Sequence, residues 1–285
     1  MKILFKADWE ETKERFRKWW AGEYFGRCAI AVTAPKNNRP PIPDPPQAES
    51  IEQQYRDLDL ISARNDFVMS HTFYGGEALP VWSGGAHRGY TSIPALLGCP
   101  IHLDWDTGWS NAILMDEDIR FQRLKINKED WKYRFSLDTL RRGVKEARGK
   151  SLVCIGALDG CGDVLAALRG TERLLFDCVE RPEEVRAAGE FLMDIWYEYY
   201  DTLLGMIRQA DEGSVDWMPL WSPGKFYPAQ NDFACNISPK MYRALFLPAI
   251  ESQTRFLDHC IYHLDGVGNF AHLDALLALI PTLGN

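Results

Sequence analysis

The chain is 285 residues long, and its 46% hydrophobic and 12% aromatic content is enough to bury a large core. Its formal net charge of -8, from 32 Lys and Arg against 40 Asp and Glu, disfavours nucleic acid and anionic membrane surfaces as partners. The start, MKILFKADWEETKERF, becomes charged too early for a secretory signal, and no apolar run approaches a membrane span. The cysteines form no CxxC pair, as is typical of reduced thiols. The sequence therefore predicts a globular cytoplasmic protein.

The N-terminal part begins with a predicted helix over residues 8–22, whose tryptophans and Phe16 gather toward one face. We expect this helix, within residues 1–27, to dock on the main body. An apolar strand is predicted at 28–35, and the proline-rich stretch PKNNRPPIPDPPQAES that follows predicts a long loop. Ser50 then opens a helix through residue 67.

Strand and helix patterns alternate over the rest of the chain. Helices are predicted around 137–149, from Pro182 to Gly213 and from Ser238 to 257, and further strands are predicted at 78–84, 100–106, 151–158, 214–221 and 260–265. Such alternation favours a parallel sheet, either a TIM (β/α)8-type barrel or a doubly wound sheet. Six strand candidates fall short of the eight of a closed barrel, so we expect a barrel that lacks its last strand and helix at the C-terminus, or else an open sheet.

Polar side chains follow several of these strands. In a parallel α/β sheet, functional groups gather at the carboxyl edge, where strands end. Alone, each such residue could cap a helix or bind backbone. Together they predict one site, with His263, Asp265, Asp159 and Asp232 as catalytic residues and Trp221, Lys225 and Gln230 as substrate-binding residues.

A metal site is a further hypothesis for the HLDG turn. Imidazole and carboxylate two residues apart at a strand end, as in His263 and Asp265, can both reach one ion, and His272 is a candidate third ligand or a hydrogen-bond donor. Tryptophans near the predicted loops, such as Trp105, Trp109 and Trp217, could line a pocket or belong to the core. No GxGxxG, phosphate-binding loop or GxSxG elbow is present.

Three segments resemble a known family. They are SLVCIGALDGCGDVLAALRGTERLLFDCVERPEEV, NDFACNISPKMYRALFLPAIESQ and YHLDGVGNFAHLDALL. Together they resemble the uroporphyrinogen decarboxylase superfamily over about residues 151 to 281. The last segment is similar to the branch labelled trimethylamine corrinoid protein 2. The resemblance implies one barrel domain over residues 1–285.

The resemblance implies one of two chemistries. The decarboxylases bind tetrapyrrole carboxylates through an arginine-rich N-terminal segment, which is absent from TAPKNNRPP, and His71 or Tyr74 stands near the position of their pyrrole-binding aspartate. The zinc-dependent methyltransferases carry a His-x-Cys motif, where this chain has His263 as the matching zinc ligand and Asp265 in place of cysteine. The resemblance therefore favours a methyl- or alkyl-group transferase that acts with a corrinoid protein.

The sequence leaves two other functions open. One is a decarboxylase, or another lyase, acting on a tetrapyrrole or a small carboxylic acid, and the other is a non-catalytic binding barrel. In each case a small-molecule ligand is expected. Zinc and a homodimer also stay open.

Overall fold

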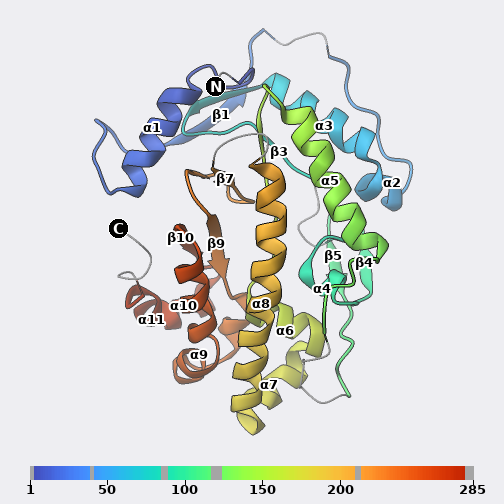
Figure 1. Ribbon diagram of the computed structural model, residues 1–285, viewed down its shortest axis with the longest axis vertical. Coiled ribbons are helices and arrows are strands. Elements are labelled where there is room, and N and C mark those ends of the chain that lie inside the picture. Colours follow the sequence, from blue (N-terminus) through green and yellow to red (C-terminus); the bar gives the residue numbers. More distant parts are fainter. Residues whose placement is uncertain (1–2, 39–41, 85–88, 117–123, 209–212, 280–285) are drawn as a thin grey trace.

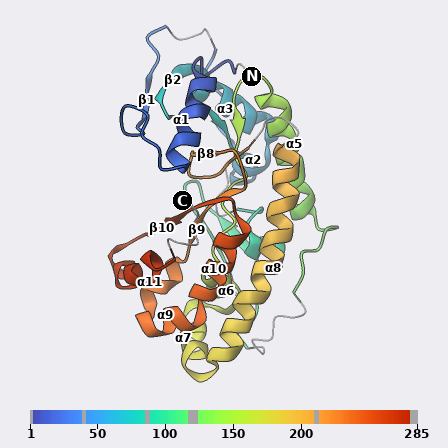
Figure 2. The same ribbon diagram turned by 60° about the vertical axis from the view of Figure 1, so that its left-hand side comes forward.

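The computed structural model describes residues 3–38, 42–84, 89–116, 124–208 and 213–279. The long helix α8 (Pro182–Ile207) runs along the longest axis of the molecule (Figure 1). Helices α1 and α3 lie toward one end of this axis, and α7 and α9 lie toward the other, as both ribbon views agree (Figure 2). The predicted end of the α8 helix at Gly213 falls beside residues 209–212, which lie outside the described residues.

Helices and short strands alternate along the described chain. The remaining helices are α1 (Trp9–Trp20), α2 (Ile51–Arg56), α3 (Leu58–His71), α4 (Ile93–Leu96), α5 (Trp131–Ala147), α6 (Cys161–Arg169), α7 (Thr171–Glu180), η1 (Asp232–Asn236), α9 (Pro239–Leu245), α10 (Leu247–Phe256), η2 (Val267–His272) and α11 (Leu273–Leu277). The strands are β1 (Ala31–Pro35), β2 (Thr72–Gly76), β3 (Val81–Trp82), β4 (Ile101–Leu103), β5 (Gly108–Ser110), β6 (Leu152–Val153), β7 (Ser214–Val215), β8 (Trp221–Ser222), β9 (Phe226–Gln230) and β10 (His259–His263).

The described strands pair into five two-stranded sheets, so the fold is mixed α/β. Two pairs are parallel, β3 with β6 and β9 with β10. The Ile155 N–H donates to the Val215 carbonyl at 3.2 Å, which joins the chain after β6 to β7, and β7 in turn lies beside β9. These contacts give the spatial order β3, β6, β7, β9, β10. The expected barrel is not present as a continuous hydrogen-bonded ring within the described residues.

The prediction of one strand over 214–221 is wrong, because the structure has two short strands there. The chain reverses between β7 and β8, which pair antiparallel, so Trp221 does not stand at the carboxyl end of a barrel strand. The segment after it, predicted as a loop, contains β9, whose residues Phe226–Ala229 are buried. Strand β9 pairs with β10 in register, with Pro228 opposite Ile261.

The N-terminal helix α1 packs against β8 with the apolar face that the sequence predicts. Its buried residues Trp9 and Phe16 contact Trp221, and Trp9 meets that indole edge-on at 5.7 Å between ring centroids. The Trp20 Nε1 atom also donates to the Trp221 carbonyl at 2.9 Å. Trp221 is 1% exposed. These contacts make Trp221 part of the core that holds α1, not of a substrate site.

Several helices begin where their capping residues predict. The Ser50 and Ser238 side chains accept the backbone N–H groups of Gln53 and Met241. The helix predicted from Ser50 divides at Asp57 into α2 and α3, and the helix predicted from Ser238 divides at Phe246 into α9 and α10. Helix propensity does not predict these breaks. At the first of them, the Asp57 side chain caps α3 by accepting the N–H groups of Asp59 and Leu60, which ends α2 there.

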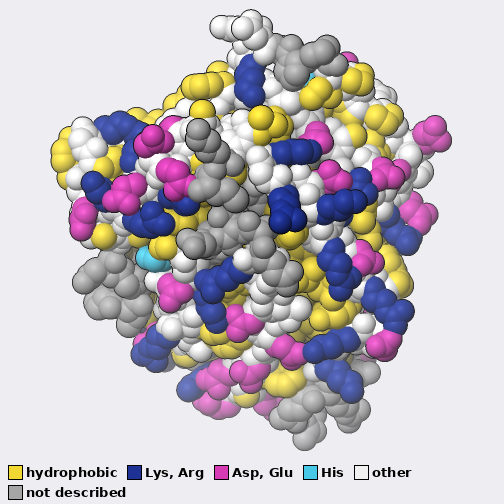
Figure 3. Space-filling view, turned by 45° about the horizontal axis from the view of Figure 1, so that its top comes forward, with side chains coloured by type: hydrophobic (Ala, Val, Ile, Leu, Met, Phe, Trp, Pro, Cys, Tyr) yellow, Lys and Arg dark blue, Asp and Glu magenta, His cyan; other side chains and the backbone are white. Residues whose placement is uncertain are grey.

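The surface carries both charge signs interspersed on the face drawn in Figure 3. Among the described residues, no helix combines the length and hydropathy that a membrane span needs.

The main core surrounds α8, whose inward side buries Leu192, Trp196, Tyr200 and Leu203. Trp196 and Tyr200 stack at 4.9 Å between ring centroids, and Tyr227 of β9 packs edge-on against Trp196. Helix α8 is thereby fixed to the strands beneath it.

A buried carboxylate fastens the N-terminal segment to the end of β2. Glu77 is 3% exposed and accepts from the Arg15 Nε, from both terminal nitrogens of Arg27 and from the Ile30 N–H, at 2.6 to 2.7 Å. Burial alone would raise the pKa of Glu77, but the Arg27, Ile30 and Arg15 hydrogen bonds outweigh it and lower that pKa to about 2. Glu77 therefore joins three chain segments.

We predict that Glu77→Gln lowers the free energy of unfolding by roughly 2–4 kcal/mol at pH 7, because two guanidinium groups lose their buried anionic partner. Since the folded pKa lies below the unfolded value of 4.5, this stabilisation is complete above pH 4.5 and is lost as the pH falls toward 2. Urea unfolding across pH 2–7 measures it, with exposed Glu11→Gln as the control. Equal stability of wild type and Glu77→Gln at pH 7 would contradict the prediction.

Candidate functional site

One cavity of about 460 Å³ collects most of the polar strand-end residues. We call it the acidic cavity, and its titratable lining residues are Asp159, Asp163, Asp232, His263 and Asp265. The structure thus brings together all four residues that the sequence predicts as catalytic. Their catalytic role stays a prediction, but the predicted convergence on one mouth is what the geometry shows.

The turn after β6 supplies the first carboxylate. Asp159 has φ of 59°, which makes it a non-glycine residue in the left-handed region at the wall of the cavity. Gly160 follows, and a Cβ there would stand 1.9 Å from the Gln230 carbonyl oxygen. Only glycine allows this approach, so the turn lies directly against the end of β9.

Asp163 lies in the first turn of α6. Its Oδ1 accepts the Phe233 N–H at 2.9 Å, which ties α6 to η1, while its buried Oδ2 has no hydrogen-bond partner among the described residues. Burial raises the pKa of Asp163 to about 7, against the lowering effect of the Phe233 N–H. The negative charges of Asp232 and Asp159 add to the rise. Asp163 can therefore exchange a proton near neutral pH.

The paired strands β9 and β10 supply the opposite groups. Gln230 and His263 are the last residues of their strands and lie side by side in the register, so their side chains share one face. Both line the acidic cavity. The His263 ring packs edge-on against Trp217 at 5.0 Å between centroids, and its buried Nδ1 has no hydrogen-bond partner among the residues that the structure describes. The Trp217 indole thus orients the imidazole.

The remaining wall comes from Ser92, which precedes α4, and from the antiparallel hairpin β4–β5. Of the tryptophans singled out in the sequence, Trp109 of that hairpin and Trp217 after β7 line the cavity. Trp109 is half exposed and stacks on His102. Trp105 lies outside the lining and is exposed.

Four predicted substrate-binding residues lie outside the acidic cavity. Trp221 packs under α1, and the Lys225 Nζ pairs with Asp201 at 2.8 Å. His71 ends α3 with its Nδ1 2.8 Å from the Phe67 carbonyl oxygen. Tyr74 lies on β2 and pairs across to β1. Trp221 and Lys225 were predicted from a strand over 214–221, which the structure replaces with the β7–β8 reversal followed by β9. His71 and Tyr74 were predicted from the family resemblance alone.

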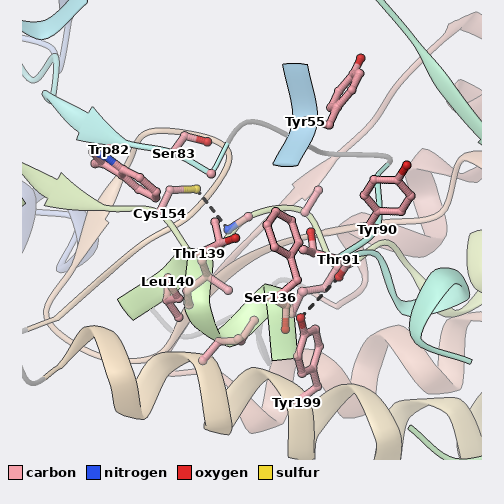
Figure 4. A pocket seen from close by; sticks show the side chains of 17 residues that line it. Tyr55, Trp82, Ser83, Tyr90, Thr91, Ser136, Thr139, Leu140, Cys154 and Tyr199 are labelled. Carbon is pink, nitrogen blue, oxygen red and sulfur yellow. Dashed lines mark hydrogen bonds between the residues drawn. The ribbon is translucent and has the colours of Figure 1, made fainter. Parts of the chain in front are cut away.

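A second, smaller cavity of about 50 Å³ lies between β3, β6 and α5 (Figure 4). It meets the acidic cavity at Ala157, which lines both. Its described lining holds no charged side chain, and its buried Thr139 hydroxyl has no partner among the described residues. The Tyr199 hydroxyl donates to the Thr91 carbonyl at 3.4 Å beside it. This space has room for a few water molecules, not for a substrate.

The metal hypothesis meets a geometric difficulty. Within the described residues, no three His, Cys, Asp or Glu side chains are grouped closely enough to hold a metal ion. His272, the candidate third ligand, is buried with its Nε2 2.8 Å from the Ala234 carbonyl oxygen. It fastens η2 to η1. The residues as they stand do not fit a zinc site built on His263.

Asp163 is the site residue that sequence reasoning missed. The segment DGCGD has an acidic residue at each end, but only the first, Asp159, directly follows the predicted strand. Its signal was the spacing, because a carboxylate four residues after Asp159 in a first helical turn returns to the same end of the sheet. What the spacing does not reveal is burial against η1, which comes from a segment 70 positions later.

Comparison with known proteins concerns the fold. No family model matches this chain, and no curated protein matches it significantly. A methyltransferase from Methanosarcina mazei has a similar structure, with a TM-score of 0.57 and 12% sequence identity. The similarity covers 90% of this chain and 71% of that protein. The chain therefore has a methyltransferase-like fold.

We predict that Asp163→Asn changes how stability depends on pH. The folded pKa of about 7 lies above the value of 3.8 expected for the unfolded chain, so wild type loses stability as the pH rises from about 4 to about 7. Asparagine carries no charge to bury, so the variant should gain ~2–4 kcal/mol over wild type between pH 4 and pH 8. Urea unfolding measures this, and exposed Asp274→Asn is the matched control. Parallel pH curves for wild type and Asp163→Asn would refute it.

Proposed function

We propose that this chain is a methyl- or alkyl-group transferase whose active site is the acidic cavity. One observation carries the proposal: Asp163 and His263 line the same cavity, and each has a buried polar atom without a hydrogen-bond partner among the described residues. Unpartnered buried polar atoms cost stability, so a site that keeps two of them fits a ligand that completes their hydrogen bonds. The methyltransferase-like fold supports the same conclusion.

The chemistry needs proton control at the group that departs. When a methyl group moves from a heteroatom to a nucleophile, the electron pair of the broken bond stays on the heteroatom, which leaves easily if it is protonated. Asp163, protonated up to about pH 7, can give that proton, and neighbouring Asp159 and Asp232 favour its protonated form. The His263 imidazole can hydrogen-bond the departing heteroatom, since a cobalt(I) acceptor has no proton to lose. A corrinoid on a partner protein would supply a cobalt nucleophile, and no step here depends on zinc.

We also propose that the fold is an incomplete barrel. The order β3, β6, β7, β9, β10 follows the chain, as neighbouring strands of a (β/α)8 barrel do. The cavity at the ends of β6, β9 and β10 fits the carboxyl face of such a barrel.

Decarboxylation of a polycarboxylate is the weaker alternative. The described lining of the acidic cavity contains four carboxyl groups and no Lys or Arg, so an anionic substrate would meet repulsion without a counter-charge. A binding barrel without catalysis is the outcome expected if the test below fails.

The proposal predicts methyl transfer to free cob(I)alamin from a panel of methanol, methylated amines and methyl thioethers, with methylcobalamin formation followed by absorbance. His263→Ala and Asp163→Asn should each slow the reaction by about 10²- to 10⁴-fold, the range for loss of an acid or base. They should fold normally, because neither removes a large apolar contact.

The matched controls are His71→Ala and Asp274→Asn, which change the same residue types outside the cavity and should keep the wild-type rate. Unchanged turnover in His263→Ala, or no transfer from any donor, would rule out the proposal. Melting temperatures compared with the core variant Trp221→Ala separate loss of function from loss of structure.

A further inference from the structure

The acidic cavity has a one-sided charge. Its lining holds the carboxyl groups of Asp159, Asp163, Asp232 and Asp265, with the His263 imidazole beside them. The thirteen residues that line it include no Lys or Arg within the described part of the chain. A cavity of this sign concentrates cations and repels anions.

An acidic cluster alone identifies no ligand, but a hydrogen-bonding requirement accompanies this one. Asp163 lines the cavity, and its buried Oδ2 has no hydrogen-bond partner among the described residues. A carboxylate oxygen accepts hydrogen bonds and donates none once ionised. The group that completes it must therefore bring an N–H or O–H donor, and a charged donor forms the stronger bond.

The walls are aromatic as well as acidic. Trp217 and Trp109 both line the cavity. Trp217 packs against the His263 ring, and Trp109, on the β4–β5 hairpin, is half exposed. Indole faces attract organic cations more strongly than other aromatic side chains do. A bare divalent metal ion gains little from them, and the described residues offer it no group of three ligands.

We infer that the acidic cavity binds a small organic cation that carries N–H donors, a protonated amine or an amidinium, with Asp163 as its direct hydrogen-bond acceptor. The inference rests on the proposed function, because it names the substrate class of the same cavity. An alkylated ammonium nitrogen already carries the proton that a neutral donor would take from Asp163, so it can leave as a neutral amine. For this substrate class Asp163 acts as an ionised acceptor that positions the nitrogen, not as its acid.

Other groups near Asp163 stay uncharged over the relevant pH range. Burial raises the pKa of the Cys161 thiol to about 12 and raises the pKa of the Tyr262 hydroxyl. The ionisable groups of the lining are therefore the carboxyl groups and the His263 imidazole. Protonation of Asp163 weakens cation binding, so a variant must isolate the effect of this one group.

The test is calorimetric binding of butylammonium, 1-butanol and butyrate to the full chain at pH 8 and pH 5.5. Butylammonium should bind at least tenfold more tightly than the neutral and anionic probes at pH 8, and at least fivefold more weakly at pH 5.5. Asp163→Asn should weaken it at least fivefold at pH 8 and reduce the pH effect, whereas Asp274→Asn should change neither. Urea unfolding checks that both variants fold.

The outcomes separate this inference from the proposed function. Equal binding of 1-butanol and butylammonium, or Zn²⁺ that binds alone and excludes butylammonium, overturns the inference. Methyl transfer from neutral donors without competition by butylammonium overturns it too, yet leaves the transferase intact. Tight, Asp163-dependent binding of butylammonium without transfer from any donor supports the inference and rejects the transferase.

Discussion

The close packing of the β6–α6 turn on the end of β9 is the constraint on which the site depends. A Cβ at Gly160 would meet the Gln230 carbonyl at 1.9 Å, and one at Gly162 would meet the Asn231 side chain at 2.3 Å. Gly160 therefore lets the turn lie against the β9 backbone, Gly162 leaves room for the Asn231 side chain, and the Asp163–Phe233 hydrogen bond closes the contact. Carboxylates from segments about 70 residues apart are brought together in this way, at a cost in mutual repulsion that burial increases.

Much of the fold could be predicted locally. Helix α1, the starts of α2, α8 and α9, and strand β10 follow from capping residues and apolar periodicity. The reversal between β7 and β8 could not, because the continuous apolar run around Trp217 reads as one strand. The reversal places Trp221 under α1, where Trp9 and Phe16 pack on its indole. Such a contact is tertiary, and the periodicity of the sequence does not predict it.

The site residues likewise include some that the sequence predicts and some that it does not. The rule that polar groups collect at strand ends holds for His263, whose strand β10 ends two residues before its predicted end. Asp159 and Gln230 line the same cavity, although β6 ends at Val153 and β9 was not predicted as a strand. The rule fails for Trp221 and Lys225, where the strand boundary itself was misplaced. The rule does not identify Asp163. Its raised pKa comes from burial against η1 and from neighbouring negative charge, and neither can be predicted from a single sequence.

The backbone of Asp159 has a consequence for how the chain could vary. A side chain held at φ of 59° costs on the order of 1 kcal/mol relative to glycine, and here it also faces other carboxylates. Selection for stability alone would favour glycine or asparagine at this position. Aspartate at this position therefore lowers stability in return for a negative charge. A variant of the chain selected only for stability would be expected to replace Asp159 first.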